Sequence, residues 1–199
     1  MGKAERRQQI LDVAKDVFAR RGYHAAKIED IVAAAGVARG TFYLYFDDKR
    51  AIFEEIVDRT IARLGMSIER VDLSAGKTVA EQVRDQIRRI FHILLEDGST
   101  TKILLSDALG VDPAFDRKLL SFYDEMGKQL EQSLRDGQEL GIVRPGDVRL
   151  MAWLTMGALK ETMFQIVHRG AEYDEDKLVD GVFAFLSVGC LRVGPVPAG

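Results

Sequence analysis

Side chains that can bind phosphate groups are concentrated in a short segment near residue 40. Arg39, Gly40 and Thr41 stand at the start of a predicted helix over residues 38–45, where exposed N–H groups and the helix dipole favour an anion. Gly40 also lets the main chain approach a bulky polyanion closely. Two tyrosine hydroxyls and one ammonium group follow and can reach phosphate oxygens. They belong to Tyr43, Tyr45 and Lys49. The segment therefore predicts a binding surface for a polyanion.

Two short helices and a tight turn position this segment. The apolar spacing predicts a helix over residues 28–35, and Gly36 suits the left-handed conformation of a turn. Phe42 and Phe46 are four residues apart, so they share one face of the next helix and are expected in the core. The other apolar contacts are expected from Ile28, Ile31, Val32 and Val37. Such a pair has the geometry of a helix-turn-helix, whose second helix enters the major groove of DNA.

The distribution of charge along the chain supports a polyanion-binding N-terminal segment, although the net charge of the whole chain does not. The chain has 199 residues and a formal net charge of −3. Residues 1–50 carry ten basic and seven acidic side chains, whereas residues 51–199 carry eighteen basic and twenty-four acidic ones. A basic N-terminal segment followed by an acidic remainder is typical of a protein that binds a polyanion through one end.

The apolar spacing is helical along nearly the whole chain, and no alternating segment typical of a strand is found. Capping residues and glycines divide the chain into nine helices. Asp48, the Thr78–Glu81 pair and Asp174 are the clearest caps, and Asp112 with Pro113 opens another helix. The predicted helices cover about residues 5–21, 28–35, 38–45, 49–70, 79–97, 100–109, 113–140, 147–170 and 175–192. The expected fold class is all-α.

The sequence gives little support for metal binding, nucleotide binding or catalysis. His24, His92 and His168 lack the spacing of metal ligands, and no nucleotide-binding or nucleophile motif is found. We therefore expect no catalytic residue, no metal and no cofactor. Cys190 is interpreted as a packing residue in an apolar helix. The N-terminus does not have the pattern of a signal peptide and no apolar run is long enough for a membrane span, so a cytoplasmic location is expected.

At residues 5–50 the chain resembles the N-terminal domain of the TetR family of transcriptional repressors. The resemblance is carried by the stretches RRQQILDVAKDVFARRGY, IEDIVAAAGVARGTFYLYF and DDKRAIF, and above all by the G-T-F-Y-x-Y-F signature followed by a lysine. It implies a DNA-binding domain over residues 1–50 and a ligand-binding and dimerisation domain over residues 51–199. It also implies a homodimer on a palindromic operator.

The resemblance assigns roles to the phosphate-binding segment. Arg39, Thr41 and Tyr43 would contact base edges or nearby phosphates, and arginine suits guanine because it can bind O6 and N7 together. Tyr45 and Lys49 would clamp the DNA backbone. The chain departs from the family pattern at Ala26 and Lys27, where many members carry hydroxyl residues that cap the second helix and touch phosphate. Lys27 would replace that phosphate contact by its charge.

The last two predicted helices are apolar over a wide arc. One apolar stripe satisfies packing onto a single core, so a wider arc needs a second partner surface. We therefore predict a dimer through a four-helix bundle made by these helices of two subunits, as the resemblance also implies. The expected interface residues are Leu154, Leu159, Val182, Phe183 and Leu186.

The resemblance places an effector pocket among the fifth to eighth helices, and this region is rich in methionine and aromatic residues. Such side chains suit a hydrophobic or amphipathic small molecule, although they can equally form the ordinary core of the domain. The expected lining is Phe91, Leu94, Leu105, Phe122, Met126, Trp153, Met156 and Lys160. Lys160 and Glu161 interrupt an apolar helix and fit a pocket, the dimer interface or solvent.

Three functions follow from these features as alternatives. The first is a repressor that binds its operator as a homodimer and is released by a hydrophobic small molecule. The second is a constitutive or activating helix-turn-helix regulator without an effector, which predicts a closed core. The third is an all-α enzyme or binding module that does not bind DNA, which predicts no salt-sensitive affinity for DNA.

Overall fold

The computed structural model describes residues 2–106, 110–111 and 113–188, and every regular element in these ranges is a helix. The helices are α1 (Lys3–Arg21), α2 (Ile28–Ala35), α3 (Arg39–Tyr43), α4 (Lys49–Ser67), α5 (Val79–Glu96), α6 (Gly98–Ser106), α7 (Pro113–Glu139), α8 (Val148–Arg169) and α9 (Glu175–Val188). The all-α prediction and the division into nine helices are confirmed within the described ranges. Cys190 and the predicted Asp112 cap lie outside the described residues.

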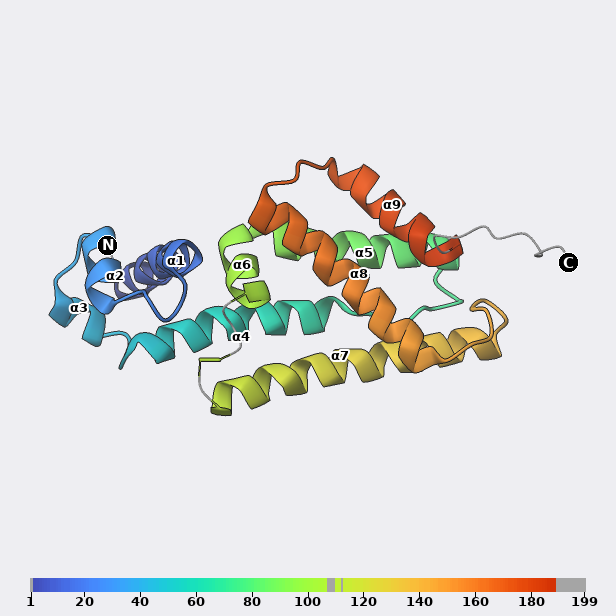
Figure 1. Ribbon diagram of the computed structural model, residues 1–199, viewed down its shortest axis with the longest axis horizontal. Helices are drawn as coiled ribbons and strands as arrows, with labels where there is room; N and C mark the ends of the chain where they lie inside the picture. The colour runs from blue at the N-terminus through green and yellow to red at the C-terminus, as the bar shows by residue number, and fades with distance from the viewer. Residues whose placement is uncertain (1, 107–109, 112, 189–199) are drawn as a thin grey trace, which may run out of the picture.

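The first three helices gather at one end of the molecule (Figure 1). The turn between α2 and α3 depends on Gly36, whose φ of 63° is in the left-handed region that favours glycine. Phe42 is fully buried and Phe46 nearly so, which confirms the predicted core face of the second helix of the pair. Their rings pack close to each other, with centroids 5.7 Å apart.

Helix α4 leads from this end into a larger helical bundle (Figure 1). The Asp48 side chain accepts a hydrogen bond from the Ala51 N–H at 2.7 Å, so the predicted cap of α4 is confirmed. In α4, Ile52, Phe53, Ile56 and Val57 are buried. Phe53 contacts Phe18 of α1, with ring centroids 5.3 Å apart, and also Phe115 of α7, at 5.5 Å. The core therefore continues from the N-terminal helices into the bundle.

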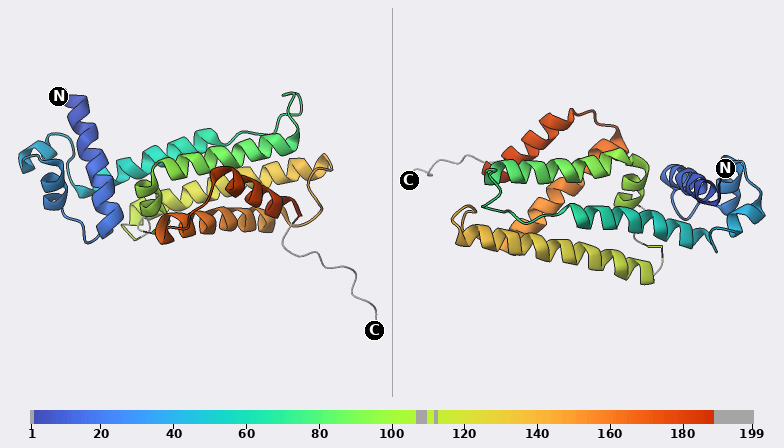
Figure 2. Two further views of the ribbon diagram at one scale, coloured as in Figure 1. Left: turned by 90° about the horizontal axis from the view of Figure 1, so that it is seen from above. Right: turned by 180° about the vertical axis from the view of Figure 1, so that it is seen from behind.

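The bundle itself consists of the long helices α4, α5, α7, α8 and α9, with the short α6 at the end that faces α1 (Figure 2). Helix α7 packs along α8, α5 packs against α9, and α6 contacts α1. The predicted capping box of α5 is present, because the Thr78 hydroxyl accepts from the Glu81 N–H while the Glu81 carboxylate accepts from the Thr78 N–H. In the described part of the chain no helix has the length and apolar character of a membrane span.

Candidate nucleic-acid interface

The segment that is predicted to bind phosphate, with Lys27, lies at the end of the molecule formed by α1 to α3. Lys27 is the N-cap residue of α2 and its side chain is exposed. No hydroxyl caps this helix, as the sequence predicted. Instead, the carboxylate of Asp30 accepts a hydrogen bond from the Lys27 N–H at 2.9 Å. The Lys27 N–H thus has a partner without the hydroxyl residues of the family pattern, and the Lys27 side chain is exposed and accessible to an anion.

Arg39 is the first residue of α3 and has defined partners on two elements. Its Nη1 lies 2.7 Å from Glu29 Oε1 in the first turn of α2. Its Nη2 donates to the Tyr43 hydroxyl at 3.4 Å, and its guanidinium lies over the Tyr43 ring, 5.8 Å from the centroid. The Tyr43 hydroxyl and the Glu29 charge raise the pKa of Arg39. A positively charged planar donor group is thus held at the tip of the turn.

The other members of the segment differ in their access to solvent. Gly40 is exposed and a Cβ added there would meet no neighbouring atom, so the main chain is open on this side. Tyr43 is exposed, whereas Thr41 and Tyr45 are half-buried. Tyr45 also packs against the core. A surface of hydroxyls and N–H groups around one arginine can bind phosphates and base edges.

Lys49 has partners that the sequence did not reveal. Its ammonium donates to three backbone carbonyls of the loop between α1 and α2, those of Tyr23 at 2.7 Å, Ala26 at 2.9 Å and His24 at 3.4 Å. It also lies 4.3 Å from the centroid of the Tyr23 ring. Burial lowers the pKa of this ammonium. In this structure the three N–H groups of Lys49 therefore fix a loop, and its contact with a DNA phosphate stays a prediction.

Arg7 is a further basic residue that sequence reasoning missed. It forms a two-pronged ion pair with Glu55 of α4, with both N···O distances 2.5 Å. Its guanidinium also lies 4.7 Å from the centroid of the Phe46 ring. Arg7 therefore ties α1 to α4 behind the binding segment. Because the partners are 48 residues apart, only the folded chain reveals the pair.

The predicted effector-pocket residues divide into three groups by burial. Phe91 and Leu94 are buried, while Leu105, Phe122, Met126 and Met156 are half-buried. Trp153 is 60% exposed and Lys160 is also exposed, so neither lies inside the bundle. The Lys160 ammonium lies 5.9 Å from the centroid of the Tyr123 ring. Glu161 is exposed too, and its carboxylate accepts from Gln165 at 2.6 Å.

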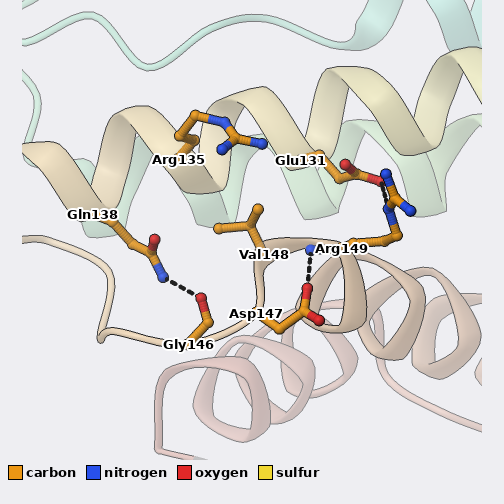
Figure 3. Close-up of a pocket in the computed structure, with 7 residues that line it drawn as sticks. All are labelled: Glu131, Arg135, Gln138, Gly146, Asp147, Val148 and Arg149. Atoms are coloured by element: carbon orange, nitrogen blue, oxygen red, sulfur yellow. Dashed lines mark hydrogen bonds and ion pairs between the residues drawn. The ribbon is translucent and has the colours of Figure 1, made fainter.

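Two pockets of about 370 and 440 Å³ are present on the described surface. The first lies where α7 and the start of α8 meet, with Arg135 and Arg149 beside Glu131 (Figure 3). The second lies between the end of α4 and the middle of α7. Most residues that line the two pockets are charged or polar, and neither pocket contains a residue of the predicted effector set. Neither of these two pockets therefore lies among the residues that are predicted to line the effector site.

The five residues that are predicted to form the dimer interface differ in how exposed they are in the single chain. Leu154 is 63% exposed, as expected of an uncovered interface residue. The other four predicted residues pack at least partly against the core of their own chain. They are Leu159, Val182, Phe183 and Leu186. The exposed large apolar residues of α8 and α9 are Leu150, Trp153, Leu154, Phe185 and Val188. This set, called the α8–α9 face below, is what a partner would cover.

Comparisons with known proteins show which family the chain resembles. A family model described as "Bacterial regulatory proteins, tetR family" matches residues 10–56. The chain is 28% identical over 190 residues to the fatty acid metabolism regulator protein of Bacillus subtilis, an alignment that covers 94% of this chain and 96% of that protein.

Solved structures show the same likeness over nearly the whole chain. The fatty acid degradation regulator FadR from Bacillus halodurans matches with 27% identity and a TM-score of 0.73, covering 96% of this chain and 99% of that one. FadR from Bacillus subtilis in complex with stearoyl-CoA matches with 28% identity and a TM-score of 0.70, covering 92% and 99%. These relatives are transcription regulators rather than enzymes. Residues 10–56 thus form an N-terminal helix-turn-helix domain of the TetR type, and over nearly its whole length the chain is similar to DNA-binding transcriptional regulators of that family.

Proposed function

We propose that this chain is a homodimeric repressor that binds a palindromic DNA operator and is released from it by a fatty acyl-CoA thioester. The single observation that carries this proposal is the likeness to fatty acid regulators along almost the entire chain, including the half beyond the helix-turn-helix. An acyl-CoA is amphipathic, which agrees with the hydrophobic or amphipathic effector expected from the methionine-rich and aromatic lining.

The proposed DNA-binding domain covers residues 1–50. Arg39 is the proposed guanine reader, because its guanidinium is exposed and can bind O6 and N7 together. Thr41 and Tyr43 are proposed to contact base edges or nearby phosphates, and Gly40 allows the main chain to approach. Lys27 and Tyr45 would bind the DNA backbone. Salt-sensitive binding follows, because each neutralised phosphate releases counterions.

The proposed partner for the α8–α9 face is a second copy of the chain. Leu150, Trp153 and Leu154 lie within about one turn of α8, and Phe185 and Val188 lie on α9. Gly157 of α8 and Gly181 of α9 have open space where a Cβ would be, which leaves room for a close helix approach. Self-pairing of two helices from each copy would bury this apolar surface and place two reading helices on one DNA molecule.

Release by the effector is proposed to use α4, the helix that joins the reading end to the bundle. An acyl chain among Phe91, Phe122, Met126 and Met156 would favour a more open arrangement of the bundle. A shift of α4 would change the separation of the two reading helices. Palindromic half-sites lie about 34–36 Å apart or at multiples of that distance, so a change of a few ångströms weakens binding.

The experiment that tests this function selects bound sequences from random duplex DNA and then measures release by acyl-CoA. The purified chain should enrich a palindrome. Acyl-CoAs of increasing chain length should raise the melting temperature and release the DNA, whereas free coenzyme A should do neither. Enrichment of no motif would refute the DNA-binding half of the proposal.

A second candidate is a regulator with no small-molecule effector. It is favoured by one observation: the two pockets described above contain none of the residues of the predicted effector lining. On this reading the chain enriches a palindrome, but no acyl-CoA changes its melting temperature or its affinity for DNA. The same pair of measurements therefore separates the two candidates.

A further inference from the structure

An ion pair links the two helices of the helix-turn-helix at its exposed end. Glu29 lies in the first turn of α2 and Arg39 is the first residue of α3. Their side chains meet at 2.7 Å and are 56% and 62% exposed. A pair with this much access to water adds little to the stability of the fold, because the solvent screens the attraction. The main effect of this ion pair is therefore expected on a property other than the stability of the fold.

The start of α2 does not need Glu29. The neighbouring Asp30 accepts the hydrogen bond from the Lys27 N–H at 2.9 Å, which is the acidic half of a capping box. Asp30 also pairs with Arg21 of α1 at 3.0 Å. The local structural roles of an acid at this position are thus already filled by Asp30, whereas the carboxylate of Glu29 is directed at Arg39.

A carboxylate beside a DNA-reading arginine has an electrostatic cost. It repels the phosphate backbone and lowers affinity for DNA of any sequence. The same carboxylate, however, restricts the rotamers of Arg39 before DNA arrives. Glu29 holds Nη1, and Tyr43 holds Nη2 and supports the guanidinium with its ring. A donor group that is already oriented loses less conformational entropy on binding and discriminates better between bases.

We propose that Glu29 is a positioning residue that orients the Arg39 guanidinium and thereby sets the base preference at the operator position that Arg39 reads. The inference rests on the proposed DNA-binding function. On this proposal Glu29 has two effects on DNA binding: it lowers the affinity for DNA of any sequence, and it raises the preference for one base at that position. The two effects have opposite signs, so they can be separated in a single variant.

The test compares four full-length proteins in selection from random duplex DNA: the unmodified chain, Arg39→Ala, Glu29→Gln and Asp47→Asn. Arg39→Ala identifies the operator position that depends on Arg39, because that position loses its preference. Asp47 is an exposed acid in the loop after α3, so Asp47→Asn removes one negative charge at the same end and leaves the Glu29–Arg39 pair intact. Melting temperatures confirm that all four proteins are folded.

The expected result is that Glu29→Gln lowers the base preference by roughly five- to tenfold at the Arg39-dependent position and leaves the other positions unchanged. Asp47→Asn should leave every position unchanged. Both variants should bind non-specific DNA more tightly than the unmodified chain, because each removes a negative charge.

Three outcomes would overturn the inference. Glu29→Gln could keep the full preference, it could change a different position from Arg39→Ala, or it could weaken all positions together as a structural defect would. An unmodified chain that enriches no motif would overturn the proposed function itself, and this inference with it. Only the first three outcomes, seen with an unmodified chain that does enrich a motif, count against Glu29 alone.

Discussion

The Lys15 ammonium lies 2.7 Å from the Asp97 carboxylate and so joins α1 of the DNA-reading end to the start of α6 in the bundle. Next to it, Asp16 accepts a hydrogen bond from the Ser99 hydroxyl at 2.9 Å. Asp97 also accepts from the N–H and the hydroxyl of Thr100, at 3.0 and 2.8 Å, and thereby caps α6. A polar link thus runs between the two ends of the molecule in addition to the covalent link through α4.

Two substitutions of Asp97 should distinguish the contribution of the helix cap to stability from the contribution of the ion pair. The substitution Asp97→Asn keeps a side chain that can cap the helix but removes the charge, so it should cost about 1–3 kcal/mol at pH 7. Asp97→Ala loses both and should cost about 1 kcal/mol more. Urea unfolding of the two variants and the unmodified chain measures these differences. Equal stability of all three proteins would show that the link contributes nothing.

The pH dependence of the same link has a definite sign. Burial opposes ionisation of Asp97, but the bonds from Lys15 and Thr100 prevail and lower its pKa below the usual value. A carboxylate with a lowered pKa stabilises the fold above its unfolded pKa of about 3.9, and this stabilisation is lost as the pH falls through the lowered folded value. The stability difference between the unmodified chain and Asp97→Asn should therefore be constant near neutral pH and shrink below about pH 4. A difference that does not shrink on acidification would contradict this origin.

Lys49 should act on DNA affinity through the loop that it holds. Lys49→Met removes the ammonium that donates to the carbonyls of Tyr23 and Ala26 and should cost about 1–3 kcal/mol of stability. Operator affinity should fall as the loop loosens, and the salt dependence separates this role from the predicted phosphate contact: if Lys49 only holds the loop, the slope of log affinity against log salt stays unchanged. Loss of a phosphate contact would instead reduce that slope by about 0.9. Lys27→Met is the control, because its exposed ammonium is the proposed phosphate ligand and its removal should reduce the slope.

Local features of the fold could be predicted from the sequence because their causes are local. The bounds of α2 were predicted correctly from apolar spacing and Gly36. The caps at Asp48 and Thr78 form hydrogen bonds with residues three positions away, so a short stretch of sequence contains both partners. Helix ends were less accurate: α4 ends at Ser67 rather than near residue 70.

Features that depend on distant partners could not be predicted in the same way. The phosphate contact of Lys49 stays a prediction, and the carbonyl groups that its ammonium contacts in the structure lie in a loop 23 to 26 residues earlier. The Glu29–Arg39 pair forms across a turn that periodicity does not describe. Trp153 is predicted to line the effector pocket because the resemblance places that pocket among the fifth to eighth helices, yet the sequence does not say which side of an apolar helix a neighbour covers. The structure leaves it exposed beside Leu154.

A charge on the α8–α9 face should separate the subunits. Leu154 is 63% exposed in the single chain, so Leu154→Glu should fold normally. In the proposed dimer the same carboxylate would be buried without a partner and should raise the dissociation constant ~100-fold or more. Leu120→Glu is the matched control, since Leu120 is an exposed leucine of α7 outside that face. Analytical ultracentrifugation should show a monomer for Leu154→Glu and a dimer for Leu120→Glu, and two dimers would place the interface elsewhere.

The aromatic contact between Phe53 and Phe115 should couple the stability of the reading end to that of the bundle. Phe115 is 1% exposed and its ring lies 5.5 Å from that of Phe53, which in turn lies 4.5 Å from the Tyr23 ring. Phe115→Ala should cost about 3–5 kcal/mol, because it leaves a cavity between the two units. Phe122→Ala is the control: Phe122 lies on the same helix but is half-buried, so its loss should cost less. Calorimetry of Phe115→Ala should show a lower and broader transition than Phe122→Ala, because the two ends no longer unfold as one unit. A sharp single transition with unchanged enthalpy would show that the Phe53–Phe115 contact is not what couples the two ends.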